Sequence, residues 1–251
     1  IPENRLVEDS VAIVMESSHC EPFLFNTASE WKSDKMGKWD YINNKDGVNK
    51  VSKSGVDKCA PFENVYTLAL RGLHDRAMNA SNNMSDRKEM LQEALMAQRQ
   101  MLVDAIGKRA EDIPQAFTPY KEVLDVYDQG LELPDDVTII WPDDNYGYMK
   151  RLSSPKEQKR SGRSGVYYHS SYLGKPHDHL WMNTTSPTLM YEELRKAYDM
   201  TADRIWLLNA GDIKSCEFAV DYFLTMAFDI DSFSFERAAN YRTEWLCGML
   251  G

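Results

Sequence analysis

The chain has 251 residues, of which 43% are hydrophobic, and a formal net charge of −10. This composition is sufficient for a buried core, so the chain is not predicted to be disordered. The negative charge argues against nucleic acid and anionic membranes as partners, because both carry the same sign of charge. No apolar run is long enough to cross a bilayer, and residues 1–20 lack a basic start followed by an apolar segment.

The four cysteines are scattered along the chain and show neither a Cys-x-x-Cys pair nor metal-ligand spacing. We therefore interpret Cys20, Cys59, Cys216 and Cys247 as buried free thiols. The sequence opens at Ile1 without an initiator methionine. This opening favours a segment of a longer protein, and its localisation cannot be read from these residues.

Short apolar runs suited to β-strands recur along the chain. Most are continuous rather than alternating, which is typical of parallel strands covered on both faces. The expected strands are residues 11–15, 65–70, 115–117, 137–141, 166–168 and 205–208.

Helical patterns separate these runs. The clearest extends from Ser85 to Lys108, with Ser85 as the expected N-cap. Another begins at Ser186-Pro187, a cap followed by proline at the first helical position. Its expected inward-facing residues are Leu189, Leu194, Ala197 and Tyr198. Further helices are expected over residues 119–129, closed by Gly130, and over 216–228 and 235–246.

The alternation of strands and helices predicts an α/β fold with a parallel sheet and right-handed crossovers. A doubly wound sheet and a (β/α)8 TIM barrel both fit this order. No glycine-rich phosphate loop follows the first strand, which weakens the dinucleotide-binding alternative. We therefore predict an incomplete (β/α)8 barrel of about six βα units, with residues 1–251 forming a segment of one barrel domain.

Ionisable or amide residues follow every predicted strand. Separate caps and turns explain any one of these clusters, but six in a row favour a shared polar pocket, because the carboxyl ends of barrel strands meet at one face. The residues are His19 and its neighbours, Arg71 to Asp75, Lys121 and Glu122, Asp143 to Asn145, His169, and Asn209 to Asp212.

The composition of this pocket favours glycoside hydrolysis. No Gly-x-Ser-x-Gly elbow is present, so acyl transfer lacks its nucleophile. Two carboxylates, one as acid and one as base, are the minimum for hydrolysing a glycosidic bond. The histidines lack the His-x-x-x-His spacing of a helical metal site. His177 and His179 lie in an expected loop, so the evidence for a metal site there is weak. We predict neither a metal nor a cofactor.

Six segments together resemble glycoside hydrolase family 115, the xylan α-glucuronidases. The resemblance covers nearly the whole chain, and its most specific part is the pair DDVTIIWPDDNYG and GVYYH. The chain departs from the family pattern at Glu16-Ser17 and Cys20. The other segments are SSHCEP, LRGLHD, PYKEV and NAGDIK.

The resemblance implies the central part of the catalytic barrel, from about its third strand onward, with the first two strands and the other domains of the parent protein absent. It implies inverting release of (4-O-methyl-)glucuronic acid linked α-1,2 to xylan or xylo-oligosaccharides. The expected partner is glucuronoxylan or a related acidic oligosaccharide. The full-length protein is expected to be secreted or periplasmic, and a homodimer is possible.

The resemblance also assigns the site residues. Glu122 and Asp75 correspond to the catalytic carboxylates, with Glu122 as the acid and Asp75 as the base. Arg71 either binds the uronate carboxylate or positions Asp75. The substrate-binding set is His19, Arg71, Asn145 and His169, whereas Asp143 and Asp144 are expected to brace their loop.

Two alternatives remain open from the sequence. In the first, this chain binds carbohydrate without catalysis of its own, because part of the pocket is missing. In the second, the protein is a metal-dependent hydrolase that uses His19, His169 and Asp212.

Overall fold

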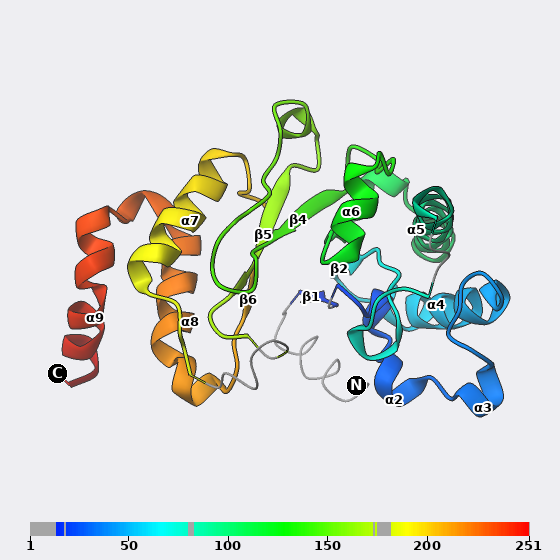
Figure 1. The fold of residues 1–251 in the computed structure, drawn as a ribbon, viewed down its shortest axis with the longest axis horizontal. Coiled ribbons are helices and arrows are strands. Elements are labelled where there is room, and N and C mark those ends of the chain that lie inside the picture. The colour runs from blue at the N-terminus through cyan, green and yellow to red at the C-terminus, as the bar shows by residue number, and fades with distance from the viewer. Residues whose placement is uncertain (1–13, 18, 80–82, 173, 175–181, 251) are drawn as a thin grey trace. The chain divides into compact units, whose positions relative to one another are not determined.

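The computed structural model describes residues 14–17, 19–79, 83–172, 174 and 182–250. The chain divides into two compact units, Ile1–Val137 and Thr138–Gly251. Each unit contains parallel strands that alternate with helices (Figure 1). Across the described ranges, no helix has the length and apolar character needed to cross a membrane.

The strands of the first unit are β1 (Met15–Glu16), β2 (Asn64–Thr67) and β3 (Gln115–Phe117). They pair in chain order and run parallel, with Met15 opposite Asn64 and Tyr66 opposite Gln115. The prediction for β3 is confirmed. The predicted extension of β2 to residue 70 is wrong, and the first predicted strand lies mostly outside the described residues.

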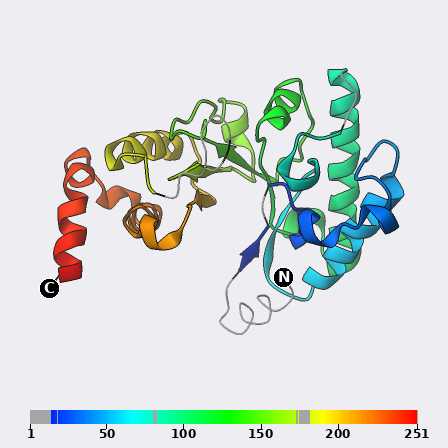
Figure 2. The same ribbon diagram turned by 60° about the horizontal axis from the view of Figure 1, so that its bottom comes forward.

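Helix α4 (Lys45–Cys59) and helix α5 (Met84–Ile106) lie side by side in the first unit (Figures 1 and 2). The predicted N-cap Ser85 is wrong, because the cap is Asn83, whose Oδ1 accepts a hydrogen bond from the Ser85 N–H at 3.0 Å, as expected of such a cap. Helix α4 was missed by the prediction, since it contains two glycines, Gly47 and Gly55, and few apolar residues.

Helix α6 (Glu122–Asp128) begins three residues later than the predicted start at residue 119. The backbone of Lys121 has φ 53° and ψ −124°, which is incompatible with a helix at that position. The helix therefore starts at Glu122. Gly130 follows its end with φ 87°, a left-handed conformation that agrees with the prediction that this glycine ends the helix. Two one-turn helices, α2 (Thr27–Glu30) and α3 (Ser33–Met36), precede α4.

The strands of the second unit are β4 (Thr138–Pro142), β5 (Ser164–His169) and β6 (Trp206–Asn209). They are also parallel, and their register places Trp141 opposite Val166 and His169 opposite Asn209. Strand β4 is buried along its length. All three agree with the predicted strands to within a few residues.

Helices α7 (Pro187–Asp199) and α8 (Ile213–Phe228) lie beside these strands, and α9 (Phe235–Leu250) lies beyond α7 (Figure 1). The predicted cap of α7 is confirmed, because the Ser186 Oγ accepts from the Leu189 N–H at 3.2 Å. Leu194 and Ala197 are buried as predicted. The predictions for Leu189 and Tyr198 are only partly right, since Met190 and Glu193 take the fully buried positions.

Short 3-10 turns complete the fold at η1 (Pro22–Leu24), η2 (Leu73–Asp75), η3 (Ala110–Asp112), η4 (Glu157–Lys159) and η5 (Ile230–Ser232). The four cysteines are free thiols, as predicted, but the predicted burial is correct only for Cys59 and Cys216. It is wrong for the half-buried Cys20 and the exposed Cys247. The α/β class with six strands in parallel ladders is likewise confirmed.

Candidate active site

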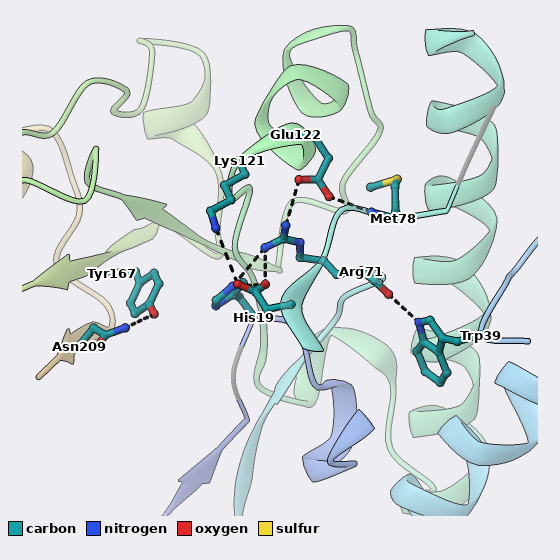
Figure 3. Close-up of polar contacts among 9 residues, drawn as sticks. His19, Trp39, Arg71, Met78, Lys121, Glu122, Tyr167 and Asn209 are labelled. Atoms are coloured by element: carbon teal, nitrogen blue, oxygen red, sulfur yellow. Dashed lines mark hydrogen bonds and ion pairs between the residues drawn. The ribbon is translucent and has the colours of Figure 1, made fainter. Parts of the chain in front are cut away.

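The carboxyl ends of β1, β2 and β3 bring four of the predicted site residues together in the first unit. His19 follows β1, Arg71 and Asp75 follow β2, and Glu122 follows β3. Parallel strands end at a common edge, so loops that are distant in sequence meet there. We call His19, Arg71, Asp75 and Glu122 the arginine cluster (Figure 3).

Arg71 holds the two predicted catalytic carboxylates at the same time. Its Nη1 donates to Asp75 Oδ1, and its Nη2 donates to Glu122 Oε2 at 3.0 Å. The Arg71 side chain is only 2% exposed, and its carbonyl accepts a hydrogen bond from Trp39 Nε1 at 2.6 Å. Hydrogen bonds between charged partners are roughly twice as strong as neutral ones, so this arginine fixes the relative position of the carboxylates.

The loop after β2 turns sharply enough to return Asp75 to Arg71. The Gly72 N–H donates to the Arg76 carbonyl at 2.9 Å. A Cβ at Gly72 would lie 2.4 Å from the Ala77 carbonyl oxygen, so glycine is required here. Asp75 itself has φ 58°, a left-handed conformation that aspartate tolerates better than most residues.

His19 and Asp75 form a second contact within the cluster. His19 Nε2 lies 3.1 Å from Asp75 Oδ1, and the imidazole packs edge-on against Tyr120 with ring centroids 4.6 Å apart. Burial opposes ionisation of Asp75, but the His19 hydrogen bond and the charges of His19, Arg71 and Lys121 together lower the pKa of this carboxyl below its usual value. Asp75 is thus held as a carboxylate.

Glu122 occupies the first position of α6. Its Oε1 accepts a hydrogen bond from the Met78 N–H at 3.1 Å, while its Oε2 is bound by Arg71 (Figure 3). A carboxylate in the first helical turn interacts favourably with the positive end of the helix dipole. The helix start, rather than a strand end, therefore sets the position of Glu122.

The geometry distinguishes the two alternatives for Arg71. Both of its terminal nitrogens are engaged by Asp75 and Glu122, and among the described residues its buried Nε has no hydrogen-bond partner. Because the Arg71 side chain is only 2% exposed, a carboxylate of a ligand has no access to its remaining N–H donors. This arrangement favours Arg71 as a positioning residue over Arg71 as a uronate ligand.

The second unit carries a buried Asp143–His169 pair. Asp143 Oδ1 lies 2.5 Å from His169 Nδ1, and the two side chains are 0% and 1% exposed. Asp143 Oδ2 also accepts from the His169 N–H at 3.2 Å. With its Nδ1 proton directed at the carboxylate, His169 is fixed in one tautomer and one ring orientation.

The predicted bracing of the loop after β4 is confirmed. Asp143 accepts from the N–H groups of Asn145 at 3.1 Å and Gly147 at 3.0 Å. Asp144 Oδ1 accepts from Tyr146 at 3.0 Å and Tyr148 at 3.2 Å. Asn145, the predicted ligand contact, sits within this loop with φ 70°.

Aromatic residues surround His169, and the sequence prediction did not select them. The ring centroids of Tyr167 and Tyr172 lie 4.6 and 5.7 Å from the His169 ring. Asn209 Nδ2 donates to Tyr167 Oη at 2.7 Å (Figure 3). Tyrosine faces bind the apolar faces of sugar rings, and their spacing around His169 in GVYYHSSYLG was the available signal.

One group in the described part of the chain has the spacing of a metal site. Ligand atoms of His19, Cys20 and Asp75 all lie within 4.8 Å of one another. The Arg71 guanidinium is bonded to the same Asp75 oxygen as His19, so a cation there would meet a positive charge. Of the other residues considered for metal binding, Asp212 is the N-cap of α8, and His177 to His179 lie outside the described residues.

Comparison with known proteins places this arrangement in a family. The sequence model of glycosyl hydrolase family 115 matches residues 1–251. A solved structure described as a family GH115 4-O-methyl-α-glucuronidase, BtGH115A, with specificity for decorated arabinogalactans, is 40% identical with a TM-score of 0.91. The similarity covers 97% of this chain and 33% of that protein, so the chain spans about a third of its length. No match is found among curated proteins. The chain belongs to glycosyl hydrolase family 115.

Proposed function

We propose that the protein releases (4-O-methyl-)glucuronic acid linked α-1,2 to xylan or xylo-oligosaccharides by an inverting acid/base mechanism. The observation that carries this proposal is the binding of Asp75 and Glu122 by the two terminal nitrogens of one buried arginine. Hydrolysis of a glycosidic bond needs two carboxyl groups held at a defined separation, and Arg71 supplies that constraint.

Asp75 acts as the general base in this mechanism. Its lowered pKa keeps it ionised in mildly acidic solution, and His19 orients it. Asp75 removes a proton from the attacking water, which adds to the anomeric carbon from the side opposite the leaving group.

Glu122 acts as the general acid, since Asp75 takes the other role. It donates its proton to the glycosidic oxygen as the bond to the leaving sugar breaks. Each Glu122 oxygen already accepts one hydrogen bond, from Arg71 or from Met78. A proton on Oε1 would displace the Met78 contact, so we propose that protonation at this oxygen accompanies substrate binding.

The residues of the second unit would hold the sugar. We propose that Asn145 and His169 bind hydroxyl groups, with His169 presented by the buried Asp143. Tyr167 and Tyr172 provide aromatic faces beside the imidazole.

We propose further that the six strands are consecutive units of a (β/α)8 barrel in a larger secreted or periplasmic enzyme. The family membership and the share of the solved relative that this chain covers support that architecture. If this chain is tested alone, binding without release of uronic acid would favour the alternative of a carbohydrate-binding segment.

The polysaccharide itself is open to a direct test. The xylan assignment comes from the family resemblance, whereas the specificity of the solved relative favours decorated arabinogalactan as a second candidate. The full-length gene product should be incubated with glucuronoxylan and with glucuronidated arabinogalactan, and the released uronic acid quantified. Release from neither polymer would contradict the proposed function, and release from arabinogalactan alone would replace xylan as the substrate.

A further inference from the structure

A cysteine that the proposed mechanism does not use lies against the arginine cluster. Cys20 directly follows His19 and is half-buried. Ligand atoms of Cys20, His19 and Asp75 all lie within 4.8 Å of one another. His19 and Cys20 follow β1 whereas Asp75 follows β2, so the fold, and not the sequence spacing, brings these three side chains together. They are close enough to share one ion.

The three donors match the chemistry of a soft divalent cation. Proteins bind Zn²⁺ through cysteine thiolates, histidine nitrogens and carboxylate oxygens, and tetrahedral coordination places neighbouring ligand atoms roughly 3.3–3.6 Å apart. The distance of 3.1 Å from His19 Nε2 to Asp75 Oδ1 is close to this spacing. A shift of about 1 Å brings the Cys20 sulfur into the same range. Mg²⁺ and Ca²⁺ fit poorly, because they bind oxygen ligands.

Arg71 limits how tightly these residues can hold a cation. Its Nη1 donates to Asp75 Oδ1, the oxygen that His19 also contacts. An ionised carboxylate has about four lone-pair positions, so Asp75 can bind a metal while it keeps the hydrogen bond from Arg71. The positive charge of Arg71 still repels the metal ion and weakens its binding. This geometry therefore favours a cation that binds reversibly over a permanently bound cofactor.

We propose that His19, Cys20 and Asp75 form a binding site for Zn²⁺ and other thiophilic divalent cations, and that such a cation inhibits the enzyme. Cys20 binds as the thiolate and His19 through an unprotonated nitrogen, so the displaced protons pass to solvent. A cation on Asp75 lowers the basicity of this carboxylate, which then no longer accepts a proton from the attacking water. The inhibition rests on the proposed function of Asp75 as the base, whereas the binding does not.

Titration with Cd²⁺ tests the binding, because a bond between cadmium and a thiolate absorbs in the ultraviolet and reports directly on the sulfur. The proteins to compare are the full-length gene product, Cys20→Ser and the matched control Cys247→Ser, which removes an exposed thiol on α9. Cys20→Ser should weaken the tightest phase of the titration by at least about 10-fold, since even the loss of a group that only supports a metal ligand costs about 10- to 100-fold. Cys247→Ser should leave that phase unchanged.

Inhibition of uronic acid release by Zn²⁺ should depend on the same cysteine. Each rate is divided by the rate of the same variant without metal, and excess chelator should restore it. Cys20→Ser should need at least about 10-fold more Zn²⁺ for half inhibition than wild type. A wild type that binds Cd²⁺ through Cys20 but releases no uronic acid from any polymer contradicts the proposed function alone. Full activity with the metal bound through Cys20 would overturn the inhibition.

Alkylation of the wild-type protein gives a test that does not depend on the folding of a variant. A metal ion bound to a thiolate protects it from iodoacetamide, so Zn²⁺ should slow the alkylation of Cys20. The exposed Cys247 should react at the same rate with and without Zn²⁺. Mass spectrometry of the peptides measures both rates. Alkylation of Cys20 that Zn²⁺ does not slow, or identical Cd²⁺ titrations of wild type and Cys20→Ser, would overturn the proposed site.

Discussion

The arginine cluster and the Asp143–His169 pair both join an acidic residue to a cationic or potentially cationic one, but they differ in burial. In the arginine cluster the buried Arg71 holds carboxylates that remain partly exposed, at 34% for Asp75 and 16% for Glu122. Both members of the Asp143–His169 pair are inaccessible to solvent. Groups that exchange protons with water must be reachable, whereas groups that fix a geometry benefit from burial.

This difference predicts how each region responds to substitution. Changes to the exposed carboxylates should remove activity with a modest effect on folding. Changes to the buried pair should lower folding stability and activity together, because an unsatisfied buried group costs its full desolvation penalty.

The largest expected effect is on the catalytic carboxylates. Glu122→Gln and Asp75→Asn should each lower kcat by about 10²- to 10⁴-fold, since each removes a proton donor or acceptor of the reaction. Steady-state release of uronic acid by the full-length gene product measures this loss, and circular dichroism should show a retained fold. Glu63→Gln, an exposed carboxylate before β2, is the control. Less than a tenfold loss in both cluster variants would remove these residues from the catalytic role.

The second prediction concerns the buried pair. Asp143→Asn replaces an acceptor with an amide whose N–H₂ faces either the His169 Nδ1–H or a backbone N–H. We expect a loss of about 1–3 kcal/mol in the free energy of unfolding. Denaturant titration measures it, and Asp144→Asn, whose side chain is more exposed, should lose less. Equal stability of wild type and Asp143→Asn would contradict the structural role of this pair.

The third prediction is a pH dependence of stability at the end of β1. Burial raises the pKa of Glu16 to about 7, with the Thr67 hydrogen bond opposing the shift. Because the folded-state pKa is raised, the unfolded chain ionises first, and this group's contribution to stability falls as pH rises from about 4.5 to 7. Glu16→Gln should reduce the change of the thermal unfolding midpoint with pH over that range. Parallel curves for wild type and variant would exclude this contribution.

The smallest expected effect is at Trp39, whose indole N–H donates a hydrogen bond to the Arg71 carbonyl. Trp39→Phe removes the indole donor to the Arg71 carbonyl and keeps an aromatic ring beside Trp31 and Phe25. The free energy of unfolding should fall by about 0.5–1.5 kcal/mol, the net value of one hydrogen bond. Urea unfolding measures it, with Trp245→Phe on α9 as a control. An unchanged midpoint would show that this contact does not stabilise the loop.

The sequence predicted β3 to β6 well, because their apolar runs are continuous and polar residues follow their ends. The α/β class followed from the alternation of predicted strands and helices. Ser186-Pro187 correctly indicated the start of α7. Helix α4 was missed since its burial depends on packing against α5, whereas its glycine content and few apolar residues give a weak local signal.

The sequence indicated four residues that the structure brings together, but it did not indicate the contacts between them. Polar residues after successive strands indicated that Arg71, Asp75 and Glu122 converge. The dual binding of the carboxylates by Arg71 depends on the turn at Gly72 and on the start of α6, neither of which has a distinctive local pattern.

The pairing of Asp75 and Glu122 as base and acid is tested most directly by the configuration of the first product. Two carboxyl groups roughly 6.5–9.5 Å apart leave room for a water and give inversion, whereas groups about 5–5.5 Å apart give a covalent intermediate and retention. Time-resolved proton NMR of uronic acid released from an α-linked substrate by the full-length gene product distinguishes these outcomes. The proposed mechanism predicts that the β-anomer appears first. Initial formation of the α-anomer would contradict the assignment of Asp75 as base and Glu122 as acid.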